Sequence, residues 1–218
     1  MKIITENIKK TVAYLKREFN ESEYLKAHEN EKQYRYYHTI RVASIGQEIA
    51  LAENLNEEAL VIGCLLHDIS YVKTFSSQED IRNHGRIAAK IAREFLKTLT
   101  LDAGLVAEIL YGIAIHVDDK ADFEGERTKL ALSISDCDNI DRFDAYRLYE
   151  GLLGSNLNTM SFDKQIEFVE KITTRLKELL NFDMATDTAK KLWRDKVNYQ
   201  INFYERLRKQ LGQSLLNY

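Results

Sequence analysis

Proline is absent from the 218 residues of the chain, and glycine occurs only nine times. A β-sheet protein of this length normally needs more turn residues, because tight turns depend on the backbone conformations that glycine and proline provide. Long helices joined by polar segments fit this composition better. The sequence therefore predicts an all-α protein.

Three further absences each exclude a class of protein. Lys and Arg (31) nearly balance Asp and Glu (34), so the chain lacks the basic footprint of a protein that binds nucleic-acid polymers. No apolar run approaches the length of a membrane span, and the N-terminal stretch MKIITENIKKTVAYLKREF has no apolar signal core. The only two cysteines, Cys64 and Cys137, sit in apolar segments, which favours small core residues over a disulfide framework. We therefore expect a cytoplasmic protein that does not bind membranes.

Apolar residues recur at helical spacing along most of the chain. Asn56, Asn83 and Asp102 are suitable N-caps for three of the helices. The segments SYVKTFSSQEDIRN and DDKADFEGER are expected to be loops. The expected helices cover about residues 4–19, 21–29, 32–53, 56–69, 83–99, 102–117, 128–149, 163–180 and 187–212.

The polar stretch GSNLNTMS after Gly154 reads as a linker. It predicts a core of residues 1–154, which includes the N-terminal helices, and a C-terminal helical extension of residues 155–218. The extension has no histidine, and the apolar stripes of its helices need a partner. Packing on the core is the simpler expectation, and a homodimer contact is the alternative.

The stretch CLLHDIS, residues 64–70, ends an apolar run with His67 and Asp68 side by side. Polar groups on inward faces cost free energy unless partners satisfy them, and ionised carboxylates cost most. A metal ion at the centre of the helices would satisfy such groups together, since imidazole and carboxylate side chains bind divalent transition metals. Three other histidines also lie on apolar helix faces, each on a different expected helix: His38, His84 and His116.

An aspartate near the end of the helix expected at 128–149 belongs to the same cluster. Asp138 continues the helix face of Leu130 and Ile134. Asp136 points about 200° away from Asp138, at about 100° per residue. Because the opposite side of this helix also carries apolar residues, Asp136 stays an alternative.

These residues resemble the HD-domain superfamily of metal-dependent phosphohydrolases. His38, the doublet His67-Asp68 and the stretch SDCDNIDRF carry the resemblance, and HTIRVASIGQEIA is similar to the family's helix around its first histidine. It covers about residues 30–150 and implies an HD-domain helical bundle. In that family the two histidines, the Asp of the doublet and a later Asp hold one divalent ion. The family pattern at that later position favours Asp138.

The order His…His-Asp…His…His…Asp further resembles HD proteins that hold two metals. In those proteins the additional histidines bind the second ion and the Asp of the doublet bridges both ions. This assigns His84 and His116 to a second ion and Asp68 to the bridge, with cap or surface histidines as the competing interpretation. The cofactor implied is one or two divalent ions, Mn, Fe, Co, Ni, Zn or Mg. The Gly-Tyr-Pro element of the cyclic-dinucleotide phosphodiesterases in this superfamily is missing, since the chain has no proline.

The resemblance implies a phosphohydrolase that cleaves a phosphate ester or anhydride with a metal-activated water, and His67 and Asp68 are its expected catalytic residues. The expected substrate is a nucleotide or another small phosphorylated metabolite. Arg41, Arg86 and Lys120 are candidates for binding its phosphate, with solvated surface charges as the alternative. Two other functions fit the same ligands: a di-iron oxygenase such as myo-inositol oxygenase, and a regulatory module that keeps the metal for stability alone.

Overall fold

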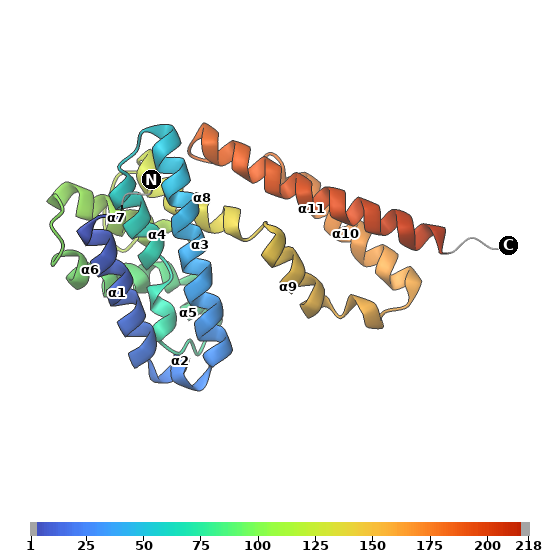
Figure 1. Ribbon diagram of the computed structural model, residues 1–218, viewed down its shortest axis with the longest axis horizontal. Coiled ribbons are helices and arrows are strands. Elements are labelled where there is room, and N and C mark those ends of the chain that lie inside the picture. The colour runs from blue at the N-terminus through green and yellow to red at the C-terminus, as the bar shows by residue number, and fades with distance from the viewer. Residues whose placement is uncertain (1–3, 215–218) are drawn as a thin grey trace. The chain divides into compact units, whose positions relative to one another are not determined.

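The computed structural model describes residues 4–214. These residues form eleven α-helices and two short 3₁₀ helices, and none of them lies in a strand, which confirms the all-α prediction. Nor is any helix in this range both long and apolar enough to cross a membrane. The elements are α1 (Glu6–Glu21), α2 (Glu23–Ala27), α3 (Glu29–Glu53), α4 (Glu57–Leu66), η1 (Ile69–Val72), α5 (Gln78–Arg82), α6 (His84–Leu96), α7 (Ala103–Ile115), α8 (Lys129–Asp141), α9 (Ala145–Ser155), η2 (Leu157–Thr159), α10 (Phe162–Leu179) and α11 (Asp187–Gln213) (Figure 1).

The chain divides into two compact units. The first runs to Asp138 and also includes Met184–Ala189. The second comprises Asn139–Asp183 and the part of α11 from Lys190 onward. Helix α8 therefore begins in the first unit and ends in the second. The boundary expected at residue 154, and the packing of the extension on the core, stay predictions.

Helix α4 lies at the centre of the first unit, where it packs against α1, α3, α6 and α7 (Figure 1). Every residue from Ala59 to Ser70 is buried. A helix that is apolar on all sides is stable only when other elements cover it completely. The expected cap of this helix is present, because the Asn56 side chain accepts a hydrogen bond from the Ala59 N–H at 3.0 Å. Cys64 on this helix is a buried free thiol, as expected.

Two glycines let α4 and α7 approach α8 closely. A Cβ atom at Gly63 of α4 would lie 2.4 Å from Ile134 Cδ1, and one at Gly112 of α7 would lie 2.6 Å from the same atom. Ile134 is fully buried on α8, so its side chain occupies the space that the two glycines leave. Each of the three helices carries a polar residue four positions further along, at its end or just beyond it: His67, His116 and Asp138.

The helix expected at 128–149 is in fact two helices, α8 and α9, so this prediction was wrong. Asp144 is the N-cap of α9: its backbone is extended, and its side chain accepts a hydrogen bond from the Ala145 N–H at 2.7 Å. A short acidic side chain that bonds the backbone locally competes with continuous helix. The apolar periodicity continues through the break and therefore conceals it.

The segment expected to be a loop at 70–83 contains η1 and α5. Ser77 and Asp80 form a capping box that starts α5, which sequence periodicity alone does not detect in so short a helix. Asn83 is the N-cap residue of α6, as expected, but its side chain makes no capping bond and instead accepts a hydrogen bond from Arg86. The expected cap of α7 is confirmed, since Asp102 accepts the Gly104 N–H at 2.8 Å.

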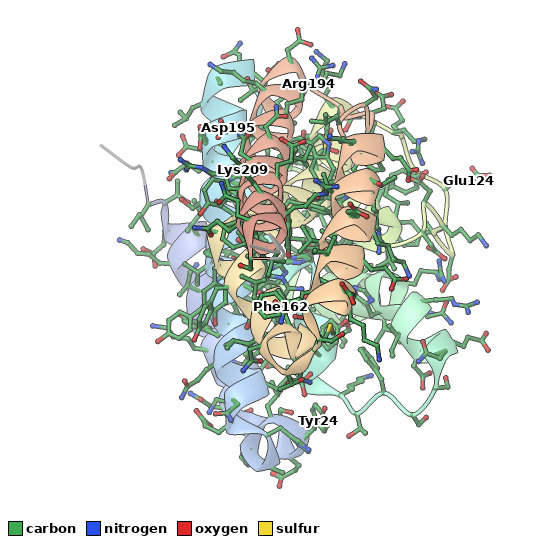
Figure 2. All side chains as sticks on the ribbon, turned by 90° about the vertical axis from the view of Figure 1, so that its right-hand side faces the viewer. Tyr24, Glu124, Phe162, Arg194, Asp195 and Lys209 are labelled. Atoms are coloured by element: carbon green, nitrogen blue, oxygen red, sulfur yellow. The ribbon has the colours of Figure 1, made fainter. Side chains whose placement is uncertain are left out.

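In the second unit, α10 and α11 lie side by side and run antiparallel (Figure 1). Trp193 joins them, because its Nε1 donates to the carbonyl oxygen of Leu179 at 2.7 Å and its ring packs against Phe143 at 4.6 Å between centroids. Two ion pairs connect the helices near their surface: Lys177 with Glu205, and Arg208 with Glu170. Figure 2 shows exposed charged residues along α11, among them Arg194, Asp195 and Lys209.

Replacing Gly112 by alanine is expected to lower the free energy of unfolding by about 1–3 kcal/mol, as overpacking a core does. The added Cβ would lie 2.7 Å from the carbonyl oxygen of Ala131, which is backbone and cannot rotate away. Gly63→Ala should cost less, because its Cβ meets only side-chain atoms. Urea unfolding followed by circular dichroism measures both effects.

The matched control is Gly151→Ala on α9, where a Cβ would meet nothing within 4 Å. Alanine is the better helix former, so this variant should be neutral or stabilising. Equal destabilisation by all three substitutions would contradict the close approach of α7 to α8.

Candidate metal centre

The first unit brings the four expected histidines and two aspartates to one place. Their ligand atoms form three overlapping groups, within each of which all atoms lie within 4.8 Å of one another. Such groups could hold a metal ion. The groups are His38 with His67 and Asp68; His67 with His116 and Asp138; and Asp68 with His84 and His116. The fifth histidine, His28, is exposed.

Three of the histidine rings are oriented in the same way. In each, Nδ1 contacts the carbonyl oxygen of the residue three positions earlier, at 2.7 Å for His67, 2.6 Å for His84 and 2.7 Å for His116. A carbonyl oxygen only accepts, so in the neutral ring Nδ1 carries the hydrogen and Nε2 keeps its lone pair. Histidine ligands of metals are commonly fixed by such a bond at the other nitrogen.

Helix ends favour a cation at this place. His67 and His116 are the C-cap residues of α4 and α7, where backbone carbonyls without helical partners leave partial negative charge. Each ring bonds one of these carbonyls and presents Nε2 beyond the helix. The two helix ends therefore supply both a histidine donor and an electrostatic preference for positive charge.

Asp68 places one carboxylate oxygen toward each pair of histidines. Oδ2 lies 3.7 Å from Nε2 of His38 and 3.7 Å from Nε2 of His67. Oδ1 lies 3.2 Å from Nε2 of His84 and 3.7 Å from Nε2 of His116. Ligand atoms that are about 2.0–2.2 Å from one ion lie about 3–3.5 Å from one another, so these separations are close to those around a shared ion.

Of the two aspartates that the sequence left open, the structure brings Asp138 to the histidines. Its Oδ1 lies 3.2 Å from Nε2 of His38 and 3.9 Å from Nε2 of His67. Asp136 instead accepts a hydrogen bond from the N–H of Ala185 at 2.8 Å. The helical spacing between these two aspartates separates their side chains as expected.

Burial and neighbouring charges both shift the pKa values of the residues in the centre. Burial lowers the pKa of His67 to about 4, so this ring is neutral at pH 7 and available to a metal. Burial works to raise the pKa of Asp68 and of Asp138, but the neighbouring histidines outweigh it and hold both pKa values below their usual range. Burial likewise works to lower the pKa of His116, which Asp68 outweighs, so that this pKa is raised. Two ionised carboxylates among buried rings thus attract positive charge.

The residues present fit a divalent ion. Nε2 of His67 is buried and has no hydrogen-bond partner, which is costly for a polar atom unless a ligand satisfies it. Imidazole nitrogen and carboxylate oxygen together suit Mn, Fe, Co, Ni or Zn.

Arg35 belongs to the centre and was missed from the sequence. Its Nη1 donates to Oδ2 of Asp68 at 3.2 Å, and its Cζ lies 3.3 Å from the centre of the Tyr71 ring. The side chain is 21% exposed, so the guanidinium also reaches the surface. The available signal was its spacing, because a residue three positions before His38 lies on the same face of the helix.

The three candidates for phosphate binding have different surroundings. Arg86 forms a two-bond ion pair with Asp118, at 2.7 and 3.2 Å, so a phosphate would have to displace that carboxylate. Arg41 is half-buried on α3, and Lys120 is exposed in the loop after α7. Phosphate binding by these residues stays a prediction.

Comparison with known proteins supports the fold and identifies the family. A family model for the HD domain matches residues 35–143, half of the chain. A solved structure, described as a predicted HD superfamily hydrolase from an uncultured Thermotogales bacterium, is similar with a TM-score of 0.60. The two sequences are 19% identical over 94% of this chain and 92% of that chain, so the likeness concerns the fold. No curated protein matches the chain.

Adding Mn²⁺ or another divalent ion to metal-free protein is expected to raise the midpoint of thermal unfolding. The ion would bind the folded protein and not the unfolded chain. At a free ion concentration of 100 times the Kd, such binding raises the free energy of unfolding by about 2.7 kcal/mol. Asp68→Asn should lose most of this rise, because Asp68 faces both pairs of histidines. Differential scanning fluorimetry with a metal titration measures it.

The control is Asp183→Asn, which removes a carboxylate whose side chain is 97% exposed. This variant should keep the full rise in midpoint. If Asp68→Asn keeps it too, the ions bind elsewhere on the protein.

Proposed function

This chain belongs to the HD domain family, and we propose that it is a metal-dependent phosphohydrolase. It cleaves a phosphate ester or anhydride of a nucleotide or another small phosphorylated metabolite. The observation that carries the proposal is the position of Asp68, with one carboxylate oxygen toward His38 and His67 and the other toward His84 and His116. A carboxylate that faces two sets of histidines would suit two ions, and a pair of ions can stabilise both the attacking and the leaving oxygen of phosphoryl transfer.

The two halves of the centre have distinct ligands in this proposal. His38, His67, Asp68 and Asp138 would hold one divalent ion. His84 and His116, together with Asp68, would hold a second ion. When bound, the ions supply a nucleophile at neutral pH and offset charge on the phosphoryl oxygens.

The chain's own residues prepare the centre for this chemistry. The bonds from Nδ1 to backbone carbonyls fix the rings of His67, His84 and His116 before any ion binds, so little reorganisation is needed. The low pKa of His67, about 4, keeps protons from competing for its Nε2 at neutral pH. Asp68 and His67 are buried, so bulk water does not surround their ligand atoms.

Arg35 binds a phosphoryl oxygen of the substrate in this proposal. Its guanidinium lies over the Tyr71 ring, and its Nη1 is already 3.2 Å from Oδ2 of Asp68. A planar guanidinium matches the geometry of phosphate oxygens. Tyr71 also lies 5.2 Å from the His84 ring and 5.0 Å from Phe75, between ring centroids, so aromatic side chains border this side of the centre.

Purified protein is expected to contain one or two divalent ions per chain and to release phosphate from a phosphorylated metabolite. Elemental analysis, followed by a screen of nucleotides and sugar phosphates with Mn, Co, Ni and Mg, tests both expectations. His67→Ala and Asp68→Ala should each lose the ions and lower hydrolysis to the uncatalysed rate, because both residues contribute ligand atoms.

The control for these variants is His28→Ala, which removes an exposed histidine outside the centre. It should retain wild-type metal content and rate. Hydrolysis that survives in the double variant lacking His67 and Asp68 would refute the proposal, and O₂ consumption by iron-loaded protein without phosphate release would favour the oxygenase.

Arg35→Met is expected to raise KM by about 10- to 100-fold, the equivalent of one charged hydrogen bond of about 1.5–3 kcal/mol. Steady-state kinetics and metal analysis on the same preparation separate substrate binding from metal binding. Arg17→Met is the control, since Arg17 is 58% exposed on α1 and pairs with its neighbour Glu18, outside the centre. An unchanged KM with lost metal would mean that Arg35 supports Asp68 and does not bind substrate.

A further inference from the structure

Arg86 connects the segments that carry His84 and His116. It lies two positions after His84 on α6, and its guanidinium forms two bonds with Asp118, at 2.7 Å from Nη1 to Oδ1 and at 3.2 Å from Nη2 to Oδ2. Asp118 lies two positions after His116, just beyond α7. Nη1 also donates to the carbonyl oxygen of Lys120 at 3.2 Å. The chain beyond α7 is therefore fixed to the start of α6.

The same guanidinium also bonds the residue that precedes His84. Nη2 donates to the side-chain oxygen of Asn83, the residue before His84. Asp118 Oδ1 in turn accepts the N–H of Lys120 at 3.3 Å, which fixes the turn after α7. The side chains of Arg86 and Asp118 are only 13% and 27% exposed, so water screens this pair less than an ion pair on the open surface. A lysine could not serve these partners together, because it lacks the planar set of five donors.

The two histidines need such a support because they are unusually close. Their Nε2 atoms lie 3.1 Å apart. Two ring nitrogens at this distance attract each other only when a proton or a cation lies between them, so other contacts must hold the segments together. Gly85 permits the approach, since a Cβ there would lie 2.8 Å from the carbonyl oxygen of Ala114.

We infer that Arg86 is a positioning residue for the half of the centre that His84 and His116 form with Asp68. This rests on the proposed function, and in particular on its second ion. In this role Arg86 acts through the two histidines and is not itself a ligand of the ion. It fixes the two histidine-bearing segments at the spacing that one ion needs, by bonding Asn83, Asp118 and Lys120 at once. The half that contains His38, His67 and Asp138 is built on α3, α4 and α8 and is independent of this contact.

The test is a Mn²⁺ titration of metal-free protein, with free Mn²⁺ measured by electron paramagnetic resonance. Wild-type protein should bind two ions. Arg86→Met should bind the first ion with unchanged affinity and the second about 10- to 100-fold more weakly, as losing a group that orients ligands does. Lys97→Met is the matched control: Lys97 lies at the opposite end of α6, pairs with Glu94 and is 60% exposed, so both ions should bind as in wild type.

Two further variants separate positioning from general damage to the fold. Arg86→Lys keeps the charge but not the fork of donors, and should fall between wild type and Arg86→Met. Arg86→Asp combined with Asp118→Arg exchanges the two charged side chains and so restores the ion pair. This double variant should bind the second ion more tightly than either single variant does. Circular dichroism of every variant confirms the helix content.

Three results would overturn the inference: wild-type protein that binds a single ion, Arg86→Met that binds both ions normally, or an equal loss of both ions in that variant. Phosphate release by wild-type protein is measured separately. If the second ion depends on Arg86 but no phosphate ester or anhydride is cleaved, the positioning role holds and the proposed phosphohydrolase activity fails.

Discussion

The contact of Ile134 with Gly63 and Gly112 is the packing on which the centre depends. It sets the distance between α4, α7 and α8, because neither glycine has a side chain to separate the helix from Ile134. One turn further along, the same three helices deliver His67, His116 and Asp138. Coordination distances vary by only about 0.2 Å, whereas one added methyl group would move a helix by more than that. Apolar packing four residues away therefore controls the polar geometry.

Local features of the fold and the centre could be predicted from the sequence, and features made by distant partners could not. The histidines were recognised because polar residues on apolar helix faces are unusual, and periodicity places them correctly. Periodicity carried no information about the break before Asp144, where the apolar pattern continues. It also gave only weak grounds for choosing Asp138 over Asp136, since that choice depends on contacts with His38, a hundred residues earlier in the chain.

Two arginines illustrate why residue type and spacing do not fix a role. Arg35 precedes His38 by three positions, and Arg86 follows His84 by two, so both lie near a histidine in sequence. The guanidinium of Arg35 reaches Asp68 inside the centre, whereas that of Arg86 meets Asp118 outside it. The roles differ because the tertiary structure places a different carboxylate next to each guanidinium. Only the first arrangement leaves a guanidinium beside the cluster of histidines and aspartates.

The two halves of the centre differ in what holds them. His38 and His67 come from α3 and α4, and their side chains are 4% and 0% exposed, so the surrounding core fixes them. His84 begins α6 with a side chain that is 13% exposed, and its partner segment continues into the largely exposed residues 117–128. Core packing constrains a helix terminus that opens onto a surface loop less firmly, because fewer apolar contacts reach it. The contact of Arg86 with Asp118 adds a charged, multiply bonded constraint at this terminus. The second half therefore combines the burial of His116, whose side chain is 1% exposed, with electrostatics.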